Sequence, residues 1–321
     1  MDKKDLTSAS PFRKRLAAYF AERFPLSSHL SMVVIYVLAN QFLAQILCEP
    51  EHPMRIGWFT LLGMISLFGL FLHLRVFDEH KDYADDCRFY PDRILSRGLI
   101  TLRHLKILGG TAIAAEFIAA GLRGAQAIVA VSVTFLFSWI MLHEFFVRRW
   151  LRAHFIVYAI AHMLIMPFMA ATVFSFTMRQ PFWEAPFLFW VYAVADFLAF
   201  SNWEISRKIR MPEDEVEGLA SYSKELGLFT SCVVVLVLRL LNTFLAWMVG
   251  VYLHLGPLYY GGLIVLFFGT LVGVLHFWLK PSRRTAKQLE AYGGWYIIFF
   301  YFVLAAELFR LHGVTFTGDA L

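Results

Sequence analysis

Long apolar segments recur along the chain and alternate with shorter polar stretches. There are nine of these runs, at residues 30–48, 57–74, 105–122, 125–142, 155–174, 186–200, 228–253, 257–279 and 295–308. A helix needs about 20 mainly apolar residues to cross the hydrocarbon core of a bilayer, and the shorter runs can draw on their flanks. The pattern therefore predicts an all-α, polytopic membrane protein with about nine transmembrane helices.

The composition supports this interpretation and narrows the function classes. Hydrophobic residues make up 59% of the 321 residues, and 33 of them are Phe. This proportion is too high for a soluble domain of this size, so we expect membrane lipids around the protein and no nucleic acid or obligate protein partner. The three cysteines, Cys48, Cys87 and Cys232, show no pairing signature and no CxxC motif, so neither a disulfide framework nor a zinc site is expected.

The distribution of basic residues predicts the orientation of the spans. With the N-terminus inside, cytoplasmic segments hold 24 of the 29 Lys and Arg residues, whereas the outer loops hold only Arg55, Arg123 and Arg179. Residues 1–29 are charged and lack the apolar core of a cleavable signal, so we expect a cytoplasmic amphipathic segment within one transmembrane domain, 1–321. The sequence predicts an integral membrane protein, in the inner membrane if bacterial, with the N-terminus and both acidic loops in the cytoplasm.

The loop after the second predicted span combines closely spaced acids with arginines. Its acids include Asp78 and three residues that share one face of a helix, Glu79, Asp82 and Asp86. Like charges so placed repel one another unless a hard cation lies among them, and Mg²⁺ takes one or two carboxylates while it bridges to substrate phosphates. Arginines suited to phosphate oxygens follow at Arg88, Arg93 and Arg97. The loop indicates a metal–diphosphate site; the alternative is a solvated charge run that only maintains the topology.

The same stretch resembles a signature of the UbiA superfamily of intramembrane prenyltransferases. Residues 78–86 are similar, without a gap, to the family motif N-D-x-x-D-x-x-x-D. In this register, Asp78 stands where the family has Asn. The three family Asp positions are taken by Glu79, Asp82 and Asp86.

The downstream segment 91–98 resembles the family element P-x-R-P-(I/L)-x-x-G. Arg93 matches the family arginine, whereas Ile94 replaces the usual proline. The resemblance implies a UbiA-like helix bundle and a Mg²⁺ cofactor. For this loop it implies metal binding by Glu79, Asp82 and Asp86, catalytic roles for Asp78, Asp82 and Arg93, and substrate binding by Arg88 and Arg97.

The loop after the sixth span departs from the family pattern, which has a second aspartate cluster there. Aligning Gly218 and Gly227 with the family glycines puts Glu204 within a residue of the first expected Asp and Asp214 at the last, which implies metal binding by both. The cations Arg207, Lys208 and Arg210 interrupt this acidic cluster. Fixed cations can replace one metal and clamp a diphosphate directly. We expect catalysis by Lys208 and substrate binding by Arg207, Arg210, Tyr222 and Lys224; the alternative is a structural ion-pair network.

The two charged loops lie at matching points, four spans apart. This spacing predicts two four-helix halves followed by one last helix. Ionisable residues also lie inside or at the end of the apolar runs, where an unpaired charge is costly, at Glu116, Asp196, Arg239 and Glu307. Glu116 or Asp196 could neutralise Arg239, which we expect either to form a structural interhelical pair or to line the substrate chamber.

These features lead to three functional hypotheses. The first is Mg²⁺-dependent transfer of a prenyl group from a polyprenyl diphosphate to a lipid or small-molecule acceptor, with release of pyrophosphate. The second is an intramembrane terpene cyclase of the UbiA type, in which the cation is captured within its own chain. An acceptor should leave a polar pocket, whereas a cyclase should show a closed, aromatic-lined chamber. The third is a lipid-binding or transport protein without chemistry.

Overall fold

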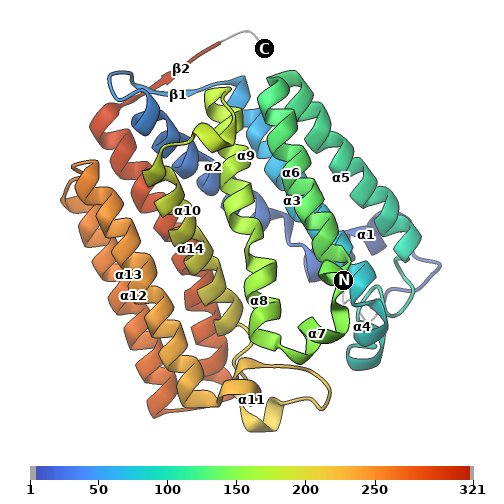
Figure 1. The fold of residues 1–321 in the computed structure, drawn as a ribbon. Helices are drawn as coiled ribbons and strands as arrows, with labels where there is room; N and C mark the ends of the chain where they lie inside the picture. Colours follow the sequence, from blue (N-terminus) through green and yellow to red (C-terminus); the bar gives the residue numbers. More distant parts are fainter. Residues whose placement is uncertain (1–4, 319–321) are drawn as a thin grey trace.

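Helices make up almost all of the computed structural model, which describes residues 5–318 (Figure 1). The long helices are α2 (Leu26–Cys48), α3 (Trp58–Lys81), α5 (Leu102–Arg123), α6 (Ala125–Leu142), α8 (Phe155–Met163), α9 (Ile165–Met178), α10 (Phe187–Ser206), α12 (Leu228–Tyr252), α13 (Pro257–Leu279) and α14 (Arg283–His312). The shorter elements are α1 (Phe12–Arg23), β1 (Met54–Ile56), α4 (Tyr83–Phe89), η2 (Glu144–Phe146), α7 (Arg148–Ala153), η3 (Phe182–Glu184), η4 (Pro212–Asp214), α11 (Tyr222–Leu226) and β2 (Val314–Phe316). The all-α prediction is confirmed.

Eight helices within residues 5–318 are long and apolar enough to cross a membrane, with α8 and α9 forming one of these spans. The prediction of about nine is therefore close, and the difference lies at α10. This helix packs within the bundle between α9 and α12, but it carries the polar residues Asp196, Asn202 and Glu204. These polar side chains are buried against other helices and not exposed to lipid. The sequence of α10 can therefore be less apolar than that of a helix that faces lipid.

The outer surface of the bundle is apolar, as expected for a protein solvated by lipid. Along α13, for example, Val265, Phe268 and Val272 are each more than half exposed. Such large exposed side chains on consecutive helical turns would be unfavourable in water. The chain is an integral membrane protein with multiple apolar helices.

The long helices follow one another around the bundle and close into a ring. Each packs on the next in the order α2, α3, α5, α6, α9, α10, α12, α13 and α14, and α14 returns to pack against α2. The first four helices and the next group thus form two sides of the ring, and α14 closes it. This order is the one that two four-helix halves plus a last helix predicts.

Close packing between α3 and α5 depends on a small residue. A Cβ atom added to Gly69 of α3 would lie 2.7 Å from Cγ of Glu116 and 3.0 Å from the carbonyl oxygen of Ala112, both on α5. In a membrane, the hydrophobic effect does not drive helices together, so close packing does. Small residues allow the helix backbones to approach closely enough for it. Gly69 therefore sets the distance between these two helices.

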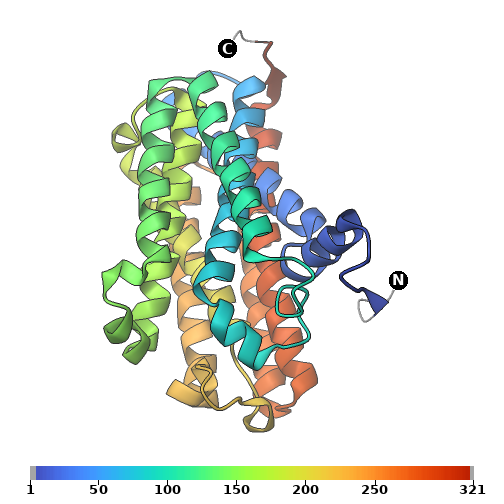
Figure 2. The same ribbon diagram turned by 90° about the vertical axis from the view of Figure 1, so that its right-hand side faces the viewer.

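The two ends of the bundle differ in character (Figure 1). One end, here named the charged end, carries α4, α7 and α11. The other, the strand end, carries β1 and β2, which pair in parallel with Arg55 opposite Thr315. Figure 2 shows α1 lying beside the bundle rather than within it. Its Tyr19 is buried in a cluster with Val76 of α3 and residues 94–105.

Candidate functional site

A cavity of about 290 Å³ lies between the charged end and the middle of the bundle, and we name it the central cavity. Its charged part is lined by Arg75, Asp78, Lys81, Asp82, Glu204, Arg207 and Lys208. The two loops that the sequence singled out therefore contribute to the same cavity. Its apolar part is lined by five methionines and several aromatic residues, among them Met32, Met141, Met163, Met166, Met169, Phe71 and Phe200.

The first loop contributes residues from the last turn of α3. Asp78 lies 3.3 Å from the ammonium group of Lys81 and 3.9 Å from the guanidinium of Arg75. Lys81 also donates a hydrogen bond to the hydroxyl of Tyr158 on α8, at 2.9 Å. Asp82 follows the helix, and no ion pair joins it to another described residue. Burial raises the pKa of Asp82 to about 6, so this carboxylate is poorly compensated.

The second loop contributes an acid held by two cations. Glu204, in the last turn of α10, accepts a hydrogen bond from Arg207 at 2.6 Å and lies 2.7 Å from the Lys208 ammonium. Spacings of three and four residues place all three side chains on one helix face, and cations are favoured at a helix C-terminus. The basic residues that interrupt the second acidic cluster thus lie in the cavity itself.

Helix breaking opens this part of the bundle. The span that follows α7 divides at Leu164 into α8 and α9. Pro167 lies three residues later, where it has no N–H to donate and its ring conflicts with the carbonyl four residues earlier, that of Met163. Met163, Ile165 and Met166, all at this break, line the cavity. The kink therefore shapes the apolar wall.

Glu79 and Asp86 lie outside the lining of the central cavity. Glu79 is buried and accepts a hydrogen bond from Arg23 of α1 at 2.6 Å, and Arg23 also lies 3.3 Å from Asp86. Arg93 lies 2.5 Å from Asp86 and stacks on the ring of Tyr90 at 3.7 Å. These residues form a network that ties α1 to the first loop. The sequence analysis missed Arg23, which lies 56 positions from Glu79.

Two arginines of the first loop also point elsewhere. Arg88 is exposed and lies 5.0 Å from the ring centre of its neighbour Phe89. Arg97 donates a hydrogen bond to the carbonyl oxygen of Leu6 at 2.7 Å. Neither Arg88 nor Arg97 lines the central cavity. Their binding of substrate stays a prediction.

The more distant residues of the second loop are dispersed. Asp214 pairs with Arg283 at the start of α14, which lowers the pKa of Asp214. The Arg210 main-chain N–H donates to the hydroxyl of Ser223, and the Lys224 side chain is exposed. None of these residues lines the cavity, so their predicted roles remain predictions.

Tyr222 packs behind the cavity. It is buried, with its ring centre 4.7 Å from that of Phe155 on α8, and its N–H donates to the carbonyl oxygen of Lys208. This contact fixes the backbone at Lys208, whose ammonium lies 5.4 Å from the ring centre of Phe155. Tyr222 is therefore placed to position Lys208.

Arg239 is fully buried on α12 and does not line the cavity. It donates a hydrogen bond to Asn202 at 2.9 Å, and its guanidinium lies 3.0 Å from the ring centre of Tyr296. Neither candidate acid is its partner among the described residues. Glu116 instead pairs with His73 on α3 at 2.6 Å. The prediction that Glu116 or Asp196 neutralises Arg239 is wrong, because an amide and an aromatic face take that place.

Among the lining residues to which the sequence analysis gave no role are Tyr158 and His162 on α8. They lie four residues apart and stack, with ring centres 4.0 Å apart. The signal was their spacing on a helix next to a proline break, which indicates a shared inner face. Both line the cavity beside the charged residues.

The donor set of the cavity fits Mg²⁺ only in combination with a phosphate ligand. Within residues 5–318, no cluster of three or more Asp, Glu, His or Cys side chains is arranged to hold a metal ion. Asp78, Asp82 and Glu204 nevertheless line one cavity, and Asp82 is a half-buried carboxylate that no ion pair joins to a cation in the described part of the chain. Mg²⁺ keeps several waters and needs only one or two carboxylates when substrate phosphates supply the rest. The residues present fit that arrangement.

The comparisons with known proteins concern the fold. The sequence matches no protein-family model and no curated protein. A UbiA homologue from Aeropyrum pernix K1 superposes with a TM-score of 0.64 at 16% identity, over 88% of this chain and 97% of that one. The chain has the UbiA fold. A digeranylgeranylglyceryl phosphate synthase structure superposes with a TM-score of 0.61 at 15% identity, over 93% of this chain and 100% of that one. The UbiA fold extends over nearly the whole chain, which confirms the architecture that the motif resemblance implied.

Proposed function

We propose that this chain is a Mg²⁺-dependent intramembrane prenyltransferase that binds an isoprenoid diphosphate in the central cavity. One observation carries the proposal: charged residues from both loops meet in one cavity whose remaining wall is mainly apolar. A diphosphate needs cations, and an isoprenoid tail needs apolar surface. In a UbiA-fold protein this combination supports an isoprenoid diphosphate as the substrate class.

The charged part suits a polyanion. Four basic and three acidic residues line it, so the cavity has a small excess of positive charge before substrate binds. Arg207 and Lys208 share one carboxylate, Glu204, which leaves donors for phosphate oxygens. Mg²⁺ bound between Asp82 and the diphosphate would neutralise charge that develops on the leaving group.

The apolar part suits the prenyl chain and its cation. Breaking the bond between the prenyl carbon and oxygen sends the electron pair to pyrophosphate and leaves an allylic cation. Polarizable methionine sulfur and aromatic faces stabilise such a cation without trapping it as water would. Methionine also adapts to irregular ligand shapes, which suits a flexible isoprenoid.

Transfer to an acceptor is favoured over cyclisation by the polar groups in the wall. His29, Tyr158 and His162 line the same cavity as the methionines, so the chamber is not a purely aromatic enclosure. Product masses separate the two reactions: a cyclised product has the mass of the prenyl group less one proton, or plus hydroxide where water is captured, whereas transfer adds the prenyl group to the acceptor in place of a proton.

The test measures pyrophosphate release from purified protein with Mg²⁺ and farnesyl, geranylgeranyl or longer diphosphates. Wild type should release pyrophosphate, and Asp82→Asn should reduce the rate by roughly 100-fold because it removes a charge aimed at the metal–diphosphate. Asp92→Asn is the matched control, since Asp92 is an exposed acid of the same loop. The proposal fails if no chain length releases pyrophosphate, or if both variants retain wild-type rates. Saturable binding without release would identify a lipid-binding protein instead.

A further inference from the structure

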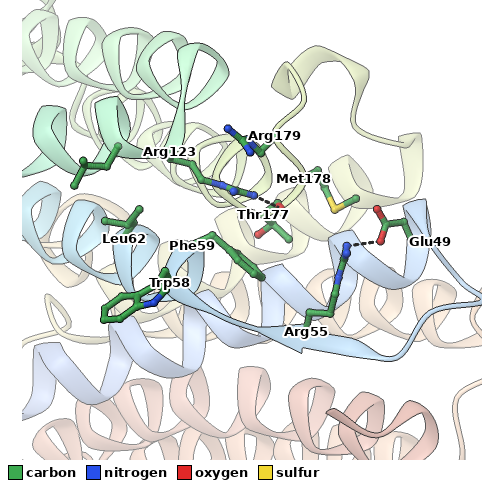
Figure 3. Close-up of a pocket in the computed structure, with 10 residues that line it drawn as sticks. Glu49, Arg55, Trp58, Phe59, Leu62, Arg123, Thr177, Met178 and Arg179 are labelled. Carbon is green, nitrogen blue, oxygen red and sulfur yellow. Dashed lines mark hydrogen bonds and ion pairs between the residues drawn. The ribbon is translucent and has the colours of Figure 1, made fainter. Parts of the chain in front are cut away.

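A second pocket lies at the strand end, opposite the central cavity, and we name it the strand-end pocket. Its volume is about 420 Å³. It collects all three arginines that the sequence places in outer loops, Arg55, Arg123 and Arg179. Figure 3 shows Arg55 and Arg123 extending into the pocket from opposite sides. The proposed prenyl transfer uses none of these residues.

Buried polar side chains hold Arg55 in place. Gln41 and Gln45 of α2, both almost completely buried, donate hydrogen bonds to the carbonyl oxygen of Arg55 at 2.6 and 3.0 Å. Gln45 also accepts from the Arg55 N–H at 2.9 Å. The side chain of Arg55 pairs with Glu49. A cation with a doubly anchored backbone pays little conformational entropy when it binds a ligand.

The other two arginines are set by the end of α9. Arg123 donates to the carbonyl oxygens of Phe176 and Thr177, at 2.5 and 2.9 Å. Arg179 is the residue that ends α9, in a left-handed conformation with φ of 55°. Helices end this way most often with Gly or Asn, because a Cβ atom is strained there. No hydrogen bond or ion pair joins the exposed Arg179 side chain to another residue in the described part of the chain.

The charge of the strand-end pocket favours an anion. Among its described lining residues, Glu49 is the sole acid against three arginines. Helix α3 begins in the pocket at Trp58 and Phe59, and its first turn has no acidic residue. The positive end of the helix dipole therefore adds to the arginine charges.

The apolar side of the pocket indicates a lipid source for that anion. Trp58 and Leu122 line it and are about half exposed on the outer surface of the bundle. The pocket lies where the spans end, so it is level with the polar head groups of a bilayer, and Trp is typical of that level. An acyl chain could lie along Trp58 and Leu122 while a phosphate meets the arginines.

We propose that the strand-end pocket binds a phosphate-bearing anion, through Arg179, Arg55 and the start of α3. The shared chemistry is the phosphate group, carried by a phospholipid head group or by free phosphate. Binding here is independent of the prenyl transfer proposed for the central cavity.

The test compares wild type with Arg179→Asn, a variant that removes the charge and suits the left-handed backbone. Native mass spectrometry measures retained phosphatidylglycerol and, as the phosphate-free control lipid, diacylglycerol; calorimetry measures inorganic phosphate. Arg103→Gln, an exposed arginine at the charged end, is the control variant. We expect wild type and Arg103→Gln to retain phosphatidylglycerol, and Arg179→Asn to lose affinity by about tenfold, as for one charge-assisted hydrogen bond.

Each result decides the proposal. Loss in Arg179→Asn of phosphatidylglycerol or of inorganic phosphate binding supports it and identifies the source. Arg55→Gln gives a second variant if Arg179→Asn fails to fold, which thermal unfolding detects. The proposal is overturned if wild type, Arg179→Asn and Arg55→Gln bind inorganic phosphate equally and either retain phosphatidylglycerol equally or each retain it no better than diacylglycerol.

A second inference concerns His162, and it rests on the proposed prenyl transfer. Nδ1 of His162 lies 2.8 Å from the carbonyl oxygen of Tyr158. A carbonyl oxygen only accepts, so Nδ1 carries the proton and Nε2 presents a lone pair. His162 is buried, with 8% of its surface exposed, yet its Nε2 has no hydrogen-bond partner in the described structure. His162 lines the central cavity with Asp78 and Lys208.

The geometry points to His162 as the group that accepts the proton released when product forms. The prenyl carbon–oxygen bond breaks and its electron pair leaves with pyrophosphate. The acceptor then forms a bond to the prenyl cation, and the proton that the acceptor loses goes to Nε2.

The test separates proton removal from ionisation by two readouts. His162→Ala should keep pyrophosphate release within a few-fold and lose transferred product by at least about tenfold, with prenyl alcohol formed instead. Added imidazole should restore product in this variant. A product-to-pyrophosphate ratio equal to wild type, or no rescue by imidazole, overturns this inference while leaving the proposed function intact. Absence of pyrophosphate release in wild type would instead reject the proposed function itself.

Discussion

Disrupting the ion pair between Arg23 and Glu79 tests whether Glu79 is a structural residue or a metal ligand. The side chain of Glu79 is 1% exposed and that of Arg23 is 18% exposed. If the pair is broken, Arg23 can be solvated by water, whereas the Glu79 carboxylate cannot. Replacing Arg23 by Met leaves a buried unpaired carboxylate, which costs about 3–5 kcal/mol in proteins. We take about 3 kcal/mol, because the partly exposed arginine leaves a route for water.

The double-mutant cycle makes this asymmetry measurable. Arg23→Met should lower the thermal midpoint in detergent by about 6 °C, at about 2 °C per kcal/mol. Glu79→Leu should lower it less, since Arg23 can still reach Asp86 and solvent. The double variant should resemble Glu79→Leu alone, so the coupling energy should equal the effect of Arg23→Met, about 3 kcal/mol. Arg13→Met, an exposed arginine on the same helix, serves as the control.

The same variants test the metal role that the family resemblance implies for Glu79. The structural role predicts that Glu79→Gln leaves the Mg²⁺ concentration for half-maximal pyrophosphate release unchanged within about twofold. The reasoning is refuted if the two stability effects simply add, or if Arg23→Met is no more harmful than Arg13→Met. A large rise in the Mg²⁺ requirement of Glu79→Gln, with little loss of stability, would restore Glu79 as a ligand.

Three further outcomes are expected. Gly69→Ala should destabilise the protein by about 1–3 kcal/mol in thermal unfolding, because its methyl group meets α5, whereas Gly110→Ala, with open space around it, should not. Asp214→Asn should leave both Mg²⁺-dependent turnover and the thermal midpoint unchanged, because the pair with Arg283 is solvent-exposed. Turnover should fall by about tenfold per pH unit below about pH 6, where Asp82, whose pKa burial raises, becomes protonated and loses its affinity for a cation; Asp82→Asn should lack this dependence.

The sequence predicts the helices better than their partners. Apolar length determined the spans, so nearly every predicted run became a helix. Rotation about the helix axis is different, because a membrane helix is apolar on most sides and carries a weak amphipathic signal. The pairing of Glu116 with His73 depends on that rotation, and so does the contact of Arg239 with Tyr296. Neither follows from position along the chain.

The candidate site was predictable where local spacing controls it. Glu204, Arg207 and Lys208 lie within five residues at the end of α10, so their clustering follows from sequence alone. Glu79 and Asp82 share the predicted acidic face, but the structure separates them: α3 ends just before Asp82, and α1 covers Glu79. A long-range contact with an N-terminal helix leaves no local signal in the acidic motif.

The asymmetry between the two loops has a physical meaning in the proposed function. On the α3 side, the central cavity has the poorly compensated Asp82; on the α10 side, one acid holds Arg207 and Lys208. A magnesium diphosphate carries both signs of charge and can match both walls, metal toward Asp82 and phosphate oxygens toward Lys208. In that orientation the prenyl chain would extend away from the charged residues and toward Met166 and Met169, which line the apolar part. If the second loop were acidic, a second metal ion would be needed to bind the phosphate oxygens on the α10 side. The second loop of this chain instead supplies the cations Arg207 and Lys208.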